Sequence, residues 1–164
     1  MNLIKKYGPY IAIGLLGLAL GFLFLPYVRG GESNRYYAIG YEAIFNIKES
    51  RLPSNVTSGS GPSAMLIIAF VLVVLSLVAL PFFKKDPTIA FMAGIATSLA
   101  GLIFFFGQLI MVLALNGIIA GTFGLYLVAT LVSCAGVISL LAGIQYLRDH
   151  KQNEANNRYS YINK

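Results

Sequence analysis

The sequence contains few of the residues that carry charge or chemistry. It has no tryptophan, one cysteine and one histidine, and Asp, Glu, Lys and Arg make up only 11% of its 164 residues. A soluble globular domain carries about 25% charged residues, so a chain with this composition could not cover a folded surface in water. Hydrophobic residues make up 57%, and the mean hydropathy is +0.75. Most of the chain is therefore predicted to lie in lipid.

The same scarcity excludes several classes of function. Cys134 stands alone inside an apolar run and is predicted to be a small buried residue. His150 lies just beyond the last run, so no cluster of His, Cys and acidic residues can form a metal site, and no Ser-His-acid set is available in the membrane. Proton relays, voltage sensors and ion pumps need ionisable residues inside the membrane, and the apolar runs contain none. We expect neither enzymatic activity nor a cofactor.

What the chain does have is four long apolar runs, at residues 9–28, 62–83, 88–115 and 118–147. Each exceeds the roughly 18 residues that a spanning helix needs. Backbone amides in hydrocarbon must be satisfied within their own segment, and the runs do not alternate as barrel strands do. The sequence predicts one domain, an all-α bundle of four transmembrane helices, with an outer loop at 29–61 and a polar tail at 148–164. Its first run is too long for a typical cleaved signal core.

The basic residues indicate the orientation of the bundle. The formal charge of +6 would suggest nucleic acid in a soluble protein, but here the charges flank the apolar runs, so no nucleic-acid partner is predicted. Eight basic residues flank one side of the membrane in short segments: Lys5, Lys6, Lys84, Lys85, Arg148, Lys151, Arg158 and Lys164. Four lie in the longer loop on the other side: Arg29, Arg35, Lys48 and Arg51. The positive-inside rule then places both termini in the cytoplasm, with the protein in the plasma membrane.

Short signals mark the two tight connections. Between the second and third runs, Asp86 suits the N-cap of the third helix, and Pro87 suits its first turn. Pro9 similarly suits the first position of the first helix. Asn116-Gly117 predicts a tight hairpin between the third and fourth helices.

The outer loop contains an aromatic segment, residues 35–49, followed by a flexible linker at 52–61. A helix over 35–49 gives one polar stripe and is favoured, while a strand places alternate aromatic and aliphatic residues on one face, and both remain open. Either form leaves apolar side chains that need cover. The headgroup layer is one candidate; a partner protein or the mouth of the bundle is the other. The candidate partner surface is Tyr36, Tyr37, Tyr41 and Phe45.

Small residues recur at helical spacing in three of the runs. Because helices in lipid associate by close packing, these faces are predicted to pack against other helices, either within the bundle or in an oligomer. The residues are Gly14, Gly17, Gly21, Gly94, Gly101, Gly121 and Gly124, with Ser139 and Gly143 a further small pair. The second run is nearly free of glycine and is predicted to face lipid.

Few polar side chains lie within the runs. Gln108 in the third run and Tyr126 in the fourth form a candidate intramembrane polar site, although an interhelical hydrogen bond is the commoner use of such an amide. The layout of four helices with a large first outer loop resembles that of claudins and other tetraspan proteins. The claudin loop signature requires tryptophan and a cysteine pair, which this sequence lacks, so no residue role is transferred.

Two functional hypotheses follow. In the first, the protein is a non-catalytic membrane subunit or scaffold that packs into a larger assembly, or associates with itself, through its glycine faces and its aromatic loop. In the second, it is a small transport, sensing or immunity-type protein that binds a lipid or an apolar ligand between its helices. The first hypothesis has an aromatic surface in its favour, and the second has the polar pair Gln108 and Tyr126.

Overall fold

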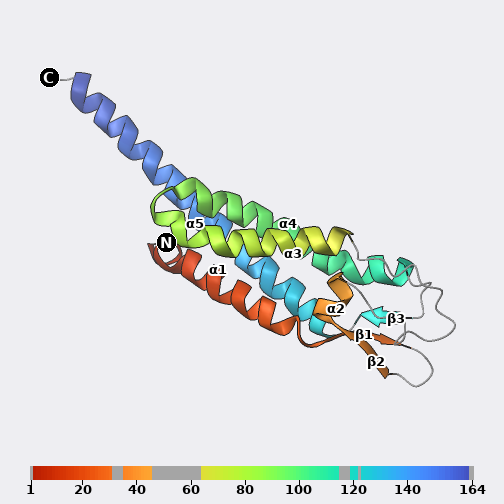
Figure 1. The fold of residues 1–164 in the computed structure, drawn as a ribbon. Coiled ribbons are helices and arrows are strands. Elements are labelled where there is room, and N and C mark those ends of the chain that lie inside the picture. The colour runs from red at the N-terminus through yellow and green to blue at the C-terminus, as the bar shows by residue number, and fades with distance from the viewer. Residues whose placement is uncertain (1, 31–34, 46–63, 115–118, 122, 163–164) are drawn as a thin grey trace.

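The computed structural model describes residues 2–30, 35–45, 64–114, 119–121 and 123–162. Four helical segments in these ranges are long and apolar enough to cross a membrane. They are α1 (Asn2–Phe22), α3 (Ala64–Ala79) with its 3-10 continuation η2 (Leu80–Lys84), α4 (Pro87–Ala114) and α5 (Phe123–Ile162). Together they form an elongated bundle (Figure 1). The predicted all-α bundle of four transmembrane helices is confirmed.

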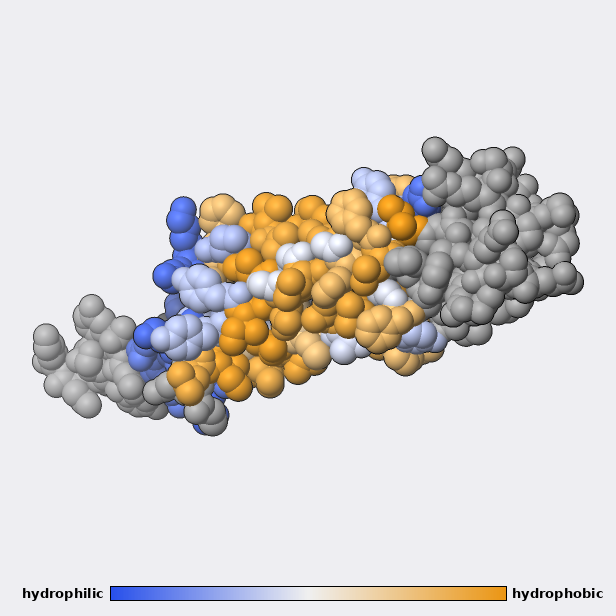
Figure 2. Space-filling view, turned by 90° about the horizontal axis from the view of Figure 1, so that it is seen from below, coloured by the Kyte–Doolittle hydropathy of each residue, from blue (hydrophilic) through white to orange (hydrophobic). Residues whose placement is uncertain are grey.

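The bundle has an apolar inside and an apolar outside. Helix α5 packs extensively against both α1 and α4, and α3 packs against α4, while α1 and α3 touch only slightly. Large apolar side chains cover the outer surface as well, about half exposed, among them Leu18, Ile68, Leu75, Leu99 and Phe105. Hydrophobic residues cover the middle of the molecule, and hydrophilic ones gather at the end from which α5 projects (Figure 2). So large an apolar surface indicates lipid as the solvent, and the chain is an integral membrane protein.

Helix α1 differs from its predicted limits at both ends. It begins at Asn2, so Pro9 lies inside the helix and not at its first position. The residues before Pro9 stay helical because they pack against α5: a Cβ on Gly8 would lie 3.0 Å from the Cβ of Ala142. The helix ends at Phe22, and the apolar residues beyond it include β1 (Pro26–Gly30).

In the described part of the chain, three short strands lie at one end of the bundle, which we call the sheet end. Strand β1 is central and pairs antiparallel with β2 (Arg35–Ile39) and with β3 (Ile119–Gly121). The sheet therefore joins the first loop to the connection between α4 and α5. The predicted start of the last helix at 118 shifts to Phe123 because β3 precedes it. The predicted turn at Asn116-Gly117 lies outside the described residues.

The aromatic segment of the first loop is part strand and part helix. Residues 35–39 form β2, against the favoured helix, and α2 (Gly40–Phe45) is helical. The Glu42 carboxylate accepts a hydrogen bond from the N–H of Ile39 at 3.3 Å, as in a capping box. The N–H groups of Gly40 and Tyr41 donate to the carbonyls of Leu25 and Leu23, each at 3.0 Å. These bonds tie the start of α2 to the end of α1; residues 46–63 lie outside the described part.

The opposite end, which we call the basic end, contains the start of α1, the α3–α4 turn and the exit of α5 (Figure 1). Asp86 caps α4 as predicted: its carboxylate accepts hydrogen bonds from the Thr88 N–H at 2.9 Å and from the Thr88 hydroxyl at 2.7 Å. Helix α5 continues to Ile162, beyond the predicted end of the span at 147. The tail is therefore a helical extension of the last transmembrane helix.

Candidate interaction surfaces

Helices α4 and α5 share the most extensive helix contact in the described part of the chain, and glycines on both helices line this seam. A Cβ on Gly94 would lie 2.5 Å from the backbone nitrogen of Leu140, and one on Gly101 would lie 2.9 Å from that of Ser133. Real Cβ atoms do not approach backbone this closely, so these positions admit only glycine unless the helices separate. Both predicted packing residues of α4 thus lie inside the bundle.

Glycines of α5 complete the seam from the other side. A Cβ on Gly136 would lie 2.6 Å from the Ser98 nitrogen, and one on Gly143 would lie 2.5 Å from the Phe91 nitrogen. The small pair Ser139 and Gly143 pointed to this face in the sequence, but Gly136 did not stand out. The spacing of Gly136 before Ser139 and Gly143, at three and seven residues, is the signal that would have found it.

Two hydroxyl groups in the seam donate hydrogen bonds to backbone carbonyls. The buried Ser139 hydroxyl donates a hydrogen bond of 2.8 Å to the Ala90 carbonyl on the facing helix. The buried Thr97 hydroxyl donates one of 2.7 Å to the Ala93 carbonyl of its own helix. The Ser139 bond therefore links α5 to α4, as small polar side chains often do between helices in membranes, whereas the Thr97 bond stays within α4.

Three of the glycines of α1, Gly14, Gly17 and Gly21, lie on the outside of the bundle, whereas Gly8 packs against α5. A Cβ placed on Gly14, Gly17 or Gly21 meets no atom of the described residues within 4 Å, and all three glycines are exposed. The opposite side of α1, with Ala12 and Leu16, is the one that packs into the core. These three glycines do not pack within the chain as described; they form a shallow stripe on its surface, which we call the α1 glycine stripe.

The two glycines predicted near the start of the last helix have separate positions. Gly121 is the last residue of β3, so it takes part in the sheet and not in a helix face. Gly124 is buried in the first turn of α5.

The aromatic surface of the first loop is split between two elements. Tyr36 and Tyr37 lie in β2 and their side chains are outside the described set. On α2, the Tyr41 and Phe45 rings lie 4.8 Å apart, and both contact Phe70 of α3, at 6.2 and 5.2 Å between ring centroids. Helix α2 thus covers the end of the bundle, with Tyr41 still 47% exposed. Phe45 is therefore covered by the mouth of the bundle, which is one of the covers predicted for the aromatic segment.

The candidate polar pair inside the membrane is only partly visible. Gln108 lies within α4, but its side chain is outside the described set. The Tyr126 ring is 39% exposed on α5 and lies 6.3 Å from the Phe105 ring. It faces the outer surface of the bundle and not an internal chamber.

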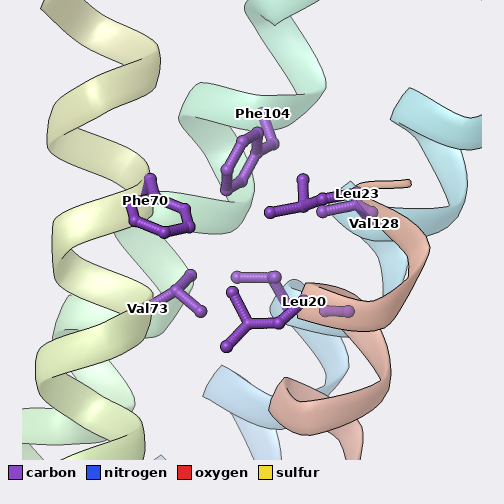
Figure 3. A pocket seen from close by; sticks show the side chains of 8 residues that line it. Leu20, Leu23, Phe70, Val73, Phe104 and Val128 are labelled. Atoms are coloured by element: carbon purple, nitrogen blue, oxygen red, sulfur yellow. The ribbon is translucent and has the colours of Figure 1, made fainter. Parts of the chain in front are cut away.

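The interior gap of the bundle is small and apolar. It lies between α1, α3, α4 and α5, where Leu20 and Leu23 approach Phe70 and Val73 across the weak α1–α3 contact (Figure 3). Among the described residues, no polar side chain lines it, and it leaves no space for a water molecule. A ligand would have to separate the helices to enter.

The basic end combines cations with aromatic rings. Lys5 forms a salt bridge with Asp149, and its ammonium lies 5.1 Å from the centre of the Tyr146 ring. Lys84 lies over the Tyr10 ring at 5.6 Å. Hydrogen bonds from the hydroxyl and the backbone N–H of Thr88 lower the pKa of the Asp86 carboxyl. Such a girdle of basic and aromatic groups suits the headgroup layer.

Comparison with known proteins gives no relative from which a role could be transferred. No protein-family model matches the chain, and no curated protein matches it. No group of three or more His, Cys, Asp or Glu side chains in the described part of the chain is placed to hold a metal ion.

Proposed function

We propose that this protein is a non-catalytic membrane subunit or scaffold that binds a transmembrane helix of a second copy, or of another membrane protein, through the α1 glycine stripe. One observation carries the proposal. A Cβ added to the seam glycines of α4 and α5 would collide with the backbone of the facing helix, whereas Gly14, Gly17 and Gly21 present the same kind of surface with no described helix on it. Small-residue faces are the common surfaces for helix association in lipid.

The surroundings of the stripe support the same role. Exposed Ile11 and Leu18 lie beside the glycines, and side chains next to a glycine groove can pack against an incoming helix. The partly exposed Tyr41 on α2 offers a further contact at the sheet end. In this proposal the basic end lies in the cytoplasm of a cell whose plasma membrane holds the protein, since Lys5 and Arg148 lie together there and Lys84 ends η2 beside α1.

The ligand-binding alternative has less in its favour. Of its two motivating residues, Tyr126 is not among the residues that line the interior gap, and the described lining of that gap is apolar. No described contact favours transport or sensing over association.

The test is the mass of the particle extracted from its native membrane in a mild detergent, with identification of the proteins that co-purify. We expect a stoichiometric assembly larger than the 17.7 kDa chain. Gly17→Leu should release the partner, because its side chain fills the stripe at a position where a Cβ meets no described atom of another element within 4 Å. Val78→Phe adds bulk at an exposed position of α3 and should leave the assembly intact.

Two results would contradict the proposal. A wild-type particle of one chain without a protein partner would remove its basis and favour the ligand-binding alternative. Equal loss of the partner in both variants would mean that the stripe is not the contact surface. If the partner is a second copy of this chain, the ratio of the particle mass to the chain mass should stay the same when the protein is expressed in an unrelated membrane.

A further inference from the structure

A groove opens at the basic end, between the start of α1 and the part of α5 that leaves the bundle. Its volume is about 390 Å³, within the range of small-ligand sites. Lys5 lines one side. The other side is a single face of α5: Leu141, Ile144, Gln145, Arg148, Asp149 and Gln152.

The lining changes from apolar to polar along the axis of α5. Leu141 and Ile144 are 43% and 47% exposed at the end nearer the middle of the bundle. Gln145, Arg148 and Gln152 follow toward the outer end. At 1.5 Å per residue, the face from 141 to 152 extends about 16 Å. A ligand that fits this gradient needs an apolar part and a polar part at matching depths, as a lipid has where hydrocarbon meets headgroup.

The charges of the groove select the kind of headgroup. Lys5 is held by Asp149 and by the Tyr146 ring, so one cation and the carboxylate largely balance each other. Arg148 is not part of that salt bridge, and it gives the groove a net positive charge. Its guanidinium can donate two parallel hydrogen bonds to a phosphate, and the amides of Gln145 and Gln152 can donate more.

We propose that this groove binds one anionic phospholipid, with its phosphate at Arg148 and an acyl chain along Leu141 and Ile144. Basic pockets between transmembrane helices at a membrane surface are suited to such headgroups. A soluble phosphate shares the headgroup chemistry but would make no use of the apolar part of the groove. This proposal does not depend on the role of the α1 glycine stripe, which lies on another face of the molecule.

The test is native mass spectrometry of the full chain in detergent, titrated with dioleoylphosphatidylglycerol or with dioleoylphosphatidylcholine. We expect one tightly retained phosphatidylglycerol and weaker, unsaturable retention of phosphatidylcholine. Arg148→Gln should weaken phosphatidylglycerol binding about tenfold or more, the loss expected when a charge-assisted hydrogen bond to the phosphate is removed. Lys151→Gln removes the same charge three residues further along α5, outside the groove, and should weaken binding by no more than about fivefold, the contribution of one basic residue near the membrane surface.

The remaining measurements test the acyl-chain contact and whether the variants are folded. Ile144→Ser should weaken phosphatidylglycerol binding, and glycerol phosphate should not displace the lipid. Unchanged melting temperatures would show that the variants remain folded. The proposal is overturned by equal retention of both lipids, by equal effects of Arg148→Gln and Lys151→Gln, or by displacement of the lipid by glycerol phosphate.

Discussion

The α4–α5 seam and the outer face of α1 contain the same small residue at similar helical spacing, and the structure uses them in opposite ways. Gly94 and Gly136 each lie against the backbone of a facing helix, while Gly14 and Gly17 lie against nothing in the described part of the chain. A glycine pattern therefore predicts that a close approach is possible, and only the packing of the bundle decides which patterns are used internally. The unused pattern becomes the candidate surface for a partner.

The largest difference between the two surfaces should appear when one methyl group is added to each of them. Gly94→Ala places a Cβ 2.5 Å from the Leu140 nitrogen and forces α4 and α5 apart; overpacking of this kind costs about 1–3 kcal/mol. Gly17→Ala adds the same methyl group in open space. Thermal unfolding in detergent should show a clear fall in melting temperature for Gly94→Ala and no fall for Gly17→Ala. Equal melting temperatures would show that the seam is looser than described.

A second comparison tests how firmly the sheet end is held. Phe45→Ala removes the ring that packs at 5.2 Å on Phe70, and such aromatic pairs contribute about 0.5–1.5 kcal/mol beyond their buried area. Amide hydrogen exchange over residues 40–45 should accelerate by about tenfold or more. Exchange in the seam around Ser139 should not change. Faster exchange throughout the bundle would mean that α2 supports the whole fold and does not only cover one end.

The hydrogen bond across the seam should contribute less. Ser139→Ala removes the 2.8 Å bond to the Ala90 carbonyl, and interhelical bonds of this kind average about 0.6 kcal/mol. Thr130→Ala is the matched control, since its exposed hydroxyl donates only to the Tyr126 carbonyl of the same helix. Unfolding in a series of denaturing detergent concentrations should show a small loss of stability for Ser139→Ala and a smaller loss for Thr130→Ala. The reverse order would mean that the hydroxyl on the outer face contributes more to stability than the hydrogen bond across the seam.

The smallest effect should come from the turn at the basic end. Because the pKa of Asp86 is lowered by Thr88, its stabilising effect is present above the ordinary aspartate pKa and is lost as the pH falls through the lowered value. Asp86→Asn keeps a capping side chain that does not titrate. The difference in melting temperature between wild type and Asp86→Asn should shrink or change sign between pH 7 and pH 3. A difference that is constant with pH would exclude this titration.

The sequence was a good guide to whatever depends on neighbouring residues. The uncharged runs around Leu75 and Phe104 predicted spanning helices, and Asp86 before Pro87 predicted the start of α4. The errors arose where distant segments meet. Residues 35–39 became a strand because β1 pairs with them, and β1 also pairs with β3, about ninety residues further along the chain.

The sequence by itself determined the solvent, the number of spanning helices and the uneven distribution of basic residues, because hydrophobicity and charge act locally along the chain. Tertiary structure alone decided the rotation of each helix about its axis. That rotation turned Gly94 toward Leu140 and Gly17 toward the surface, and it brought Lys5 to Asp149 across the chain. Close packing depends on the shapes of two surfaces together, and one surface pattern does not specify its counterpart.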